Sequence, residues 1–261
     1  MDIFELCVIP SLLNNSDMWV LIDSAAIKRL DDLQNSMFKN LLAVPHSVPT
    51  PSLRSELGCL AMEERIDQRK LNLLFHLKTL QTSSLANEIY RLQTQYSFPG
   101  LVEECRKLFL KYNLPNIVEE NLRISKLQWK KIVKQNIMKY SEENLKQQFK
   151  TYSKLREGPL MESDLSIEPY VMNMKLRDGR TFFRIRTQML PAKLNMKNNQ
   201  KFSNELWRCD FCKKMDSQSH IMWCSAFAPL REGKNIDDDE DLVLYFQQVF
   251  KLREDMEDKM K

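Results

Sequence analysis

Three cysteines and one histidine lie close together in the pattern Cys209-x2-Cys212-x7-His220-x3-Cys224. Thiolate and imidazole groups are preferred ligands of Zn²⁺, and a C-x2-C turn directs two sulfurs toward one point. On a helix, His220 and Cys224 would share one face, because they are four residues apart. We therefore predict a zinc site. Four protein ligands leave no open coordination position, so the predicted role of the metal is structural.

Neighbouring apolar residues are expected to pack around this ion or on adjacent helices; they are Phe211, Ile221, Met222, Trp223 and Phe227. The alternative is a chance grouping of unrelated side chains. The chain has only 6 cysteines and 3 histidines, so such a grouping by chance is disfavoured. The other histidines, His46 and His76, have no comparable neighbours, and a position on a helix face or in the core is expected for His76.

The remaining cysteines, Cys7, Cys59 and Cys105, are isolated in apolar surroundings, where a free cysteine behaves as a small hydrophobic residue. This usage indicates a reduced chain inside the cell, in the nucleus or the cytoplasm. The apolar run at residues 6–16 is too short to cross a bilayer of about 30 Å. Acidic Asp2 and Glu5 precede it where a signal peptide would be basic, so no signal peptide and no membrane partner are predicted.

Charge is unevenly distributed along the chain, although the formal net charge is only +4. Residues 225–261 hold 6 basic and 10 acidic residues, whereas residues 106–157 hold 13 basic and 5 acidic residues. Residues 173–202 hold 8 basic residues, with Asp178 as their sole acid. A concentration of positive charge is typical of a polyanion partner, so we predict RNA or DNA as a ligand. For residues 106–157, a solvated helix face is an equal alternative.

The predicted nucleic-acid contacts are six of the eight basic residues of 173–202 and two lysines of the metal motif, with one aromatic residue for base stacking. They are Arg180, Arg184, Arg186, Lys193, Lys197, Lys201, Trp207, Lys213 and Lys214. Two alternatives remain open. The arginines could pair with local acids, and Trp207 could belong to the core.

Composition favours a mainly α fold, because glycine is scarce at 5 residues while 43% of the chain is hydrophobic. We predict a helical bundle, then a long basic helix and a small zinc-stapled module. The expected segments are a helical domain over 1–115, the basic helix within 116–157, a linker over 158–172, the basic segment with the zinc motif over 173–230, and a C-terminal helix with an acidic N-terminal cap within 231–261. Leu127, Ile132, Ile137 and Leu145 are the expected apolar points of the basic helix, and a further helix is expected over Arg180 to Leu190.

Several motifs, taken in order, resemble one family. Ile9-Pro10-Ser11-Leu12-Leu13 with Trp19, then Pro49-Thr50-Pro51 and Leu57-Gly58, are similar to the region after the polymerase palm of non-LTR (LINE-type) retrotransposon proteins. Phe183-Arg184-Ile185-Arg186-Thr187, Leu190 and the metal motif resemble the basic segment and zinc knuckle near their C-termini. The resemblance implies a helical thumb and connector followed by a knuckle that binds nucleic acid. This sequence departs from the family at Asn14-Asn15, where Tyr-Gly is usual, and in its three-residue last knuckle gap.

The catalytic signatures of enzymes are absent from the sequence: the [FY]-x-D-D hairpin of a two-metal polymerase, the phosphate-binding GxxxxGK[ST] loop and the GxSxG elbow. The resemblance therefore implies a catalytically inert fragment of a reverse transcriptase-type protein that binds RNA or DNA. The alternative is a helical protein-interaction module with a structural zinc site, whose partner would bind the helix stripes or the acidic tail. The sequence makes no prediction of oligomeric state.

Overall fold

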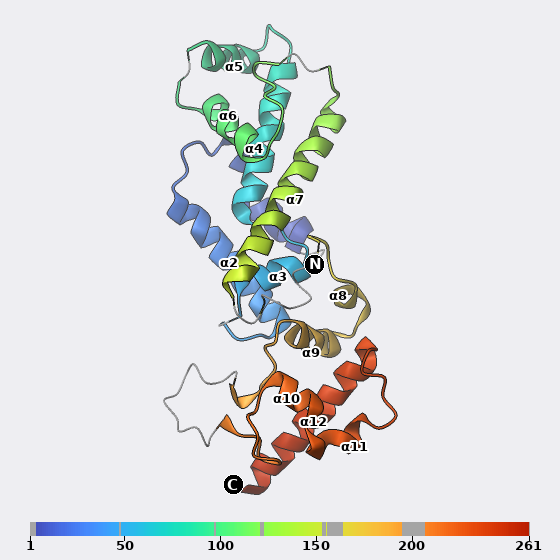
Figure 1. Cartoon of the computed structure of the whole chain (residues 1–261). Helices are drawn as coiled ribbons and strands as arrows, with labels where there is room; N and C mark the ends of the chain where they lie inside the picture. The colour runs from blue at the N-terminus through green and yellow to red at the C-terminus, as the bar shows by residue number, and fades with distance from the viewer. Residues whose placement is uncertain are drawn as a thin grey trace. The chain divides into compact units, whose positions relative to one another are not determined.

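A computed structural model describes residues 4–46, 48–96, 98–120, 123–152, 155, 164–194 and 207–260, without the side chains of residues 257, 259 and 260 (Figure 1). The predicted mainly α fold class is confirmed, since no strand longer than an isolated bridge occurs within these ranges. The helices are α1 Ile9–Leu12, α2 Ser24–Leu42, α3 Thr50–Glu56, α4 Met62–Thr79, α5 Leu85–Tyr96, α6 Leu101–Lys111, α7 Lys126–Thr151, α8 Pro169–Asn173, α9 Leu176–Arg186, α10 Gln218–Trp223, α11 Ala228–Arg231 and α12 Asp239–Met260. In this part of the chain, no helix combines the length and the apolar character needed to cross a membrane.

The chain divides into two compact units. Unit 1 contains Met1–Phe38, Leu57–Gln148 and Asp164–Ser166, and unit 2 contains Lys39–Glu56, Phe149–Ser163 and Ile167–Lys261. These units differ from the segments expected from the sequence. Most of the basic helix α7 belongs to the same unit as the first helices, and the metal motif shares one core with α12.

Unit 1 is organised around α4, which packs against α5 and α6 (Figure 1). The buried carboxylate of Glu64 accepts hydrogen bonds from the Ala61 backbone N–H at 2.8 Å and from the Ser141 hydroxyl at 3.0 Å, so it both caps α4 and contacts α7. The indole of Trp129, also on α7, is fully buried and stacks on Phe75 of α4 with ring centroids 5.5 Å apart. These contacts make α7 part of the bundle core.

The buried positions of α7 follow a strict four-residue spacing: Trp129, Val133, Ile137, Ser141, Leu145 and Phe149. Four residues turn an α-helix by about 400°, so the buried direction advances by about 40° at each step. The apolar residues therefore spiral around the helix and do not form a straight stripe. The expected apolar points are correct at Ile137 and Leu145, but Ile132 is only half-buried and Leu127 is 78% exposed.

A buried polar cluster joins α4 to the end of α6. The Tyr112 hydroxyl donates to the Asp67 carboxylate at 2.7 Å, and the Lys111 ammonium lies 3.0 Å from the same carboxylate. Burial raises the pKa of Asp67 in spite of the charge of Lys111. Burial and the neighbouring Asp67 raise the pKa of Tyr112 well above its ordinary value. Burial and Asp67 therefore both disfavour the ionised form of Tyr112 in the folded unit.

Unit 2 joins α3 to α8 and α9 through a buried ion pair. The Arg186 guanidinium lies 2.8 Å from the fully buried Glu56 carboxylate and 3.0 Å from that of Glu168. Burial raises the pKa of Glu56, although Arg186 acts in the opposite direction. Nearby, the Tyr170 ring packs edge-on against Phe182 at 4.9 Å. These contacts link residues of unit 2 that are far apart in the sequence.

The structure tests two helix predictions near the metal motif. The helix expected over Arg180 to Leu190 begins earlier, at Leu176, and ends at Arg186, so that boundary prediction is wrong. The acidic cap of the last helix is confirmed, because an Asp238 carboxylate oxygen accepts the backbone N–H groups of Glu240 and Asp241 at 3.0 and 3.1 Å. Carboxylates at this end also interact favourably with the helix dipole.

Candidate metal centre

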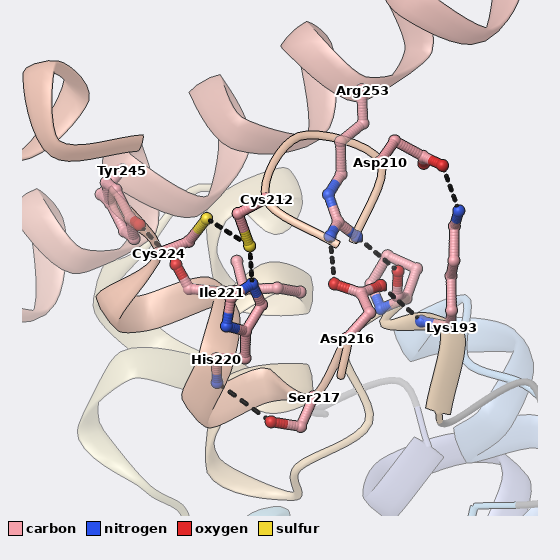
Figure 2. A network of polar contacts seen from close by, with 11 residues as sticks. Lys193, Asp210, Cys212, Asp216, Ser217, His220, Ile221, Cys224, Tyr245 and Arg253 are labelled. Atoms are coloured by element: carbon pink, nitrogen blue, oxygen red, sulfur yellow. Dashed lines mark hydrogen bonds and ion pairs between the residues drawn. The ribbon is translucent and has the colours of Figure 1, made fainter. Parts of the chain in front are cut away.

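The four predicted ligands converge on one point. Their ligand atoms, the sulfurs of Cys209, Cys212 and Cys224 and a ring nitrogen of His220, all lie within 4.8 Å of one another. The Cys212 sulfur is 3.2 Å from His220 Nε2 and 3.6 Å from the Cys224 sulfur (Figure 2). The predicted grouping of these residues is confirmed, and the group could bind a metal ion.

A tight turn presents the first two cysteines. Arg208 and Met215 form an isolated antiparallel bridge across it. The Cys209 backbone N–H donates to the Lys214 carbonyl at 2.7 Å, and the Lys213 N–H donates back to the Cys209 carbonyl at 2.9 Å. Lys213 has a φ of 62°, the left-handed conformation that reverses the chain within this short loop. We call residues 207–216 the knuckle.

The other two ligands come from α10 and the residue after it. The Ser217 hydroxyl caps this helix by accepting the His220 backbone N–H at 3.0 Å, which fixes the start of the helix one turn before the imidazole (Figure 2). Cys224 follows the last helical residue with extended backbone angles. Both side chains nevertheless reach the same point as the knuckle sulfurs.

The spacing of the ligand atoms fits a tetrahedral ion. With metal–sulfur and metal–nitrogen bonds of about 2.3 and 2.0 Å, tetrahedral angles separate two sulfurs by about 3.8 Å and a sulfur from a nitrogen by about 3.5 Å. The separations of Cys212 from Cys224 and from His220, 3.6 and 3.2 Å, are close to these values. The other separations are at most 4.8 Å, so movements of about 1 Å would bring all four ligand atoms to tetrahedral spacing.

The pKa shifts of two ligands favour metal coordination, and the pKa shift of a third opposes it. Burial raises the pKa of Cys212, but hydrogen bonds from the Lys214 backbone and neighbouring thiols, with the Lys214 charge, lower it overall. Burial lowers the pKa of His220, which favours the neutral imidazole that binds metals. Burial raises the pKa of Cys224 to about 11, so this thiol stays protonated at neutral pH in the metal-free protein. Metal binding would therefore release a proton from Cys224.

Polar contacts behind the knuckle connect it to α12. Asp216 is fully buried, and its carboxylate forms an ion pair with Arg253 of α12 and accepts the Lys193 backbone N–H at 2.8 Å (Figure 2). Tyr245 of α12 donates its hydroxyl to the Ile221 carbonyl at 2.7 Å. The knuckle and α10, which both carry ligands, are thus each bound to α12.

An apolar core lies beneath the ligands. It contains Cys209, Ile221, Cys224 and Phe227 from the metal motif with Tyr245, Phe246 and Val249 from α12. Phe211 packs edge-on against Phe227, with ring centroids 5.0 Å apart. The expected packing is therefore found for Phe211, Ile221, Met222 and Phe227. It is wrong for Trp223, whose side chain is 70% exposed.

Several of the predicted nucleic-acid contacts have partners within the protein. Arg180 donates to the Leu41 carbonyl at 2.9 Å, and Arg184 donates to the Ala43 carbonyl at 2.5 Å. Arg186 is held by the two carboxylates described above. Lys193 forms an ion pair with Asp210 at 2.5 Å.

The other predicted contacts differ in their exposure. Trp207 is half-buried, while Lys213 and Lys214 are exposed on the knuckle. Lys197 and Lys201 lie outside the described residues. Of the seven predicted residues that the structure describes, Lys213 and Lys214 are the exposed ones, and both lie beside the ligands.

Two residues that were not predicted as nucleic-acid contacts are exposed at the same site. Arg208 precedes the first ligand, and Trp223 precedes the last. Trp223 is three residues after His220, so it lies on the ligand side of α10, whereas Ile221 faces the core. The position of Trp223 between the ligands His220 and Cys224 in the sequence could have identified it as a residue of this site.

Comparisons with protein-family models, curated proteins and solved structures found no match to this chain.

Proposed function

We propose that the centre formed by Cys209, Cys212, His220 and Cys224 binds one structural Zn²⁺. A soft set of three sulfurs and one imidazole favours zinc over the hard cations that prefer oxygen ligands. Four protein ligands also leave no position for a reactive water, which supports a structural role and not a catalytic one. Elemental analysis of the purified chain tests this proposal. One zinc per chain is expected, and metal-free folded protein would contradict it.

We further propose that the zinc-bound knuckle binds single-stranded nucleic acid. The observation that carries this proposal is the group of exposed residues around the ligands: Arg208, Lys213, Lys214 and Trp223. Arg208 donates to the Lys213 carbonyl at 3.3 Å, but none of the three basic side chains forms an ion pair with any described residue, so their charges are available to phosphates. An exposed tryptophan beside basic residues favours single strands, whose bases can stack on an aromatic ring.

Titration of a fluorescently labelled oligonucleotide with the zinc-loaded chain tests this function. Binding should weaken steeply as salt rises, because each neutralised phosphate releases counterions. The double substitution Lys213→Ala, Lys214→Ala should make the negative slope of log K against log salt concentration shallower by roughly 1.4, at about 0.7 per contact with a single strand. No retention at low salt would contradict the proposal.

A matched control comes from α7, where Lys130 and Lys131 are also adjacent and exposed. The double substitution Lys130→Ala, Lys131→Ala removes the same charge from the chain at a position far from the knuckle in sequence. We expect it to change the affinity much less. Equal losses from both pairs would indicate general attraction of a polyanion to a basic protein, and the knuckle assignment would then be wrong.

The resemblance to non-LTR retrotransposon proteins supports the same function and remains a proposal about parentage. It suggests a catalytically inert piece of such a protein, with the knuckle as its nucleic-acid contact. The alternative function, a protein-interaction module with a structural zinc site, is separated by affinity capture with and without nuclease. Partners that survive nuclease digestion, together with absent oligonucleotide binding, would favour the alternative.

A further inference from the structure

A second surface, unrelated to the knuckle, lies on α5 in unit 1. One face of this helix is fixed to the bundle: Tyr90 is buried in the core, and the Asn87 side chain donates to the Leu77 carbonyl at 3.0 Å. The opposite face carries large apolar side chains that the described chain covers only in part. We call this set the α5 stripe; it consists of Leu85, Ile89, Leu92 and Tyr96.

The α5 stripe is narrow and continuous. At 100° per residue, its four members fall within about 60° of one another on the helix, and Asn87 and Tyr90 fall on the other side. The stripe members are 45–72% exposed. Phe98, which is 56% exposed, extends the surface beyond the helix, with its ring centroid 5.9 Å from that of Tyr96.

We propose that the α5 stripe is the contact surface of a homodimer, in which two copies of α5 pack antiparallel across a two-fold axis. The spacing of the stripe carries this inference. Its gaps are four, three and four residues, so the pattern is the same in both chain directions. An antiparallel copy therefore places Leu85 opposite Tyr96 and Ile89 opposite Leu92, and the same contacts recur on the other side of the axis.

The net charge of α5 and the exposed area of the α5 stripe both favour a second copy of this chain as the partner. Glu88 and Arg91 are the only charged residues of α5, so the helix has no net charge to attract a polyanion or an anionic membrane. At about 200 Å² for a large apolar side chain, the stripe with Phe98 exposes on the order of 500 Å² per copy. Two copies would bury on the order of 1,000 Å², which reaches the lower limit for specific interfaces.

Sedimentation velocity of the full chain tests the proposal after nuclease treatment and removal of nucleic acid at high salt. A species of twice the 31.0 kDa chain mass is expected to grow with concentration. A chain that stays monomeric at roughly 0.1 mM, where even weak interfaces assemble, would overturn the proposal. Because nucleic acid is absent from this assay, the outcome is independent of the proposed knuckle function.

Leu85→Glu should abolish the dimer without unfolding the chain, because the side chain that it replaces is 72% exposed. Leu110→Glu is the matched control: Leu110 is 86% exposed and lies on α6, outside the stripe. Thermal melting of both variants should match the wild type. Dimerisation that persists in Leu85→Glu, or that Leu110→Glu abolishes equally, would contradict the assignment.

The orientation of the helices has its own test. Leu85→Lys and Tyr96→Glu should each weaken self-association, because each introduces a charge opposite an apolar residue. An equimolar mixture should recover the dimer, since only the antiparallel arrangement places Lys opposite Glu and keeps the other Tyr96–Leu85 contact. If the mixture dissociates as readily as the separate variants, the antiparallel register is wrong.

Discussion

The guanidinium of Arg253 forms an ion pair with the fully buried carboxylate of Asp216, 37 residues earlier in the chain. The contact joins the long helix α12 to the end of the knuckle. A buried carboxylate that loses its cation is strongly destabilising, because its desolvation is no longer offset.

Arg253→Met should therefore lower the free energy of unfolding of unit 2 by about 3–5 kcal/mol. Chemical denaturation of the zinc-loaded chain measures this loss. Lys193→Met is the comparison, since Lys193 and Asp210 form a pair whose side chains are 28% and 35% exposed. That loss should stay within about 1 kcal/mol, as is usual for exposed pairs. Similar losses in both variants would contradict the structural role assigned to Arg253.

Removal of the metal should unfold the knuckle and leave unit 1 folded, because the proposed ligands all belong to unit 2. Cys212→Ser should bind zinc far more weakly and lose hydrogen-exchange protection in residues 207–227. Cys7→Ser is the control, since Cys7 is exposed and outside the ligand set. Unchanged protection in Cys212→Ser would show that the metal does not stabilise this region.

Trp223→Ala should raise the dissociation constant for a labelled single strand by about tenfold, because stacking of one base on an aromatic ring contributes about 1–3 kcal/mol. Trp223→Phe should retain most of the affinity. Zinc content and melting should not change in either variant, since the indole is 70% exposed. Wild-type affinity in the alanine variant would exclude Trp223 as a stacking surface.

Trp129→Ala and Leu127→Ala test the register of α7. Trp129 is fully buried between Phe75 and Phe109, and its loss should cost about 3–5 kcal/mol of unfolding free energy. Leu127 is 78% exposed, and its loss should stay within about 0.5 kcal/mol. Urea denaturation followed by circular dichroism measures both. The reverse ranking would mean that α7 faces the bundle with different residues.

The stability of unit 1 should fall as the pH rises above about 10, the ordinary pKa of tyrosine. Burial and Asp67 raise the pKa of Tyr112 in the folded state, so the unfolded chain ionises first and unfolding releases a proton. The stabilising contribution is complete below pH about 10 and is lost above it.

Tyr112→Phe should reduce this alkaline decline. At neutral pH the same variant should be less stable by about 1–3 kcal/mol, because Asp67 loses a hydrogen-bond donor. Urea unfolding of both proteins at pH values of about 8 and 10.5 separates the two effects. Parallel declines in the two proteins would contradict the role of Tyr112.

The metal centre was predictable because its information is local. Cysteine and histidine have few structural uses at such spacing, and the ligands lie within 16 consecutive residues, Cys209 to Cys224. Some helix starts also carry local signals, since Ser217 caps α10 and Asp238 caps α12. Apolar periodicity also predicted α7 itself.

Periodicity identified only Ile137 and Leu145 among the buried residues of α7, because the four-residue spacing spirals and other apolar residues fall between its members. Leu127 was expected in the core, whereas the neighbouring Trp129 occupies it. The sequence also did not predict the partners of the arginines. Arg186 pairs with Glu56, 130 residues earlier, and no local pattern reports such a contact.

The long sequence separation between the partners of these buried ion pairs also affects the order of folding during translation. Glu56 leaves the ribosome long before Arg186, and Asp216 long before Arg253, so unit 2 lacks its buried counter-charges while most of unit 1 is already outside. Domains generally fold as units during translation. We therefore expect unit 1 to fold first, with Glu56 exposed until Arg186 has been synthesised.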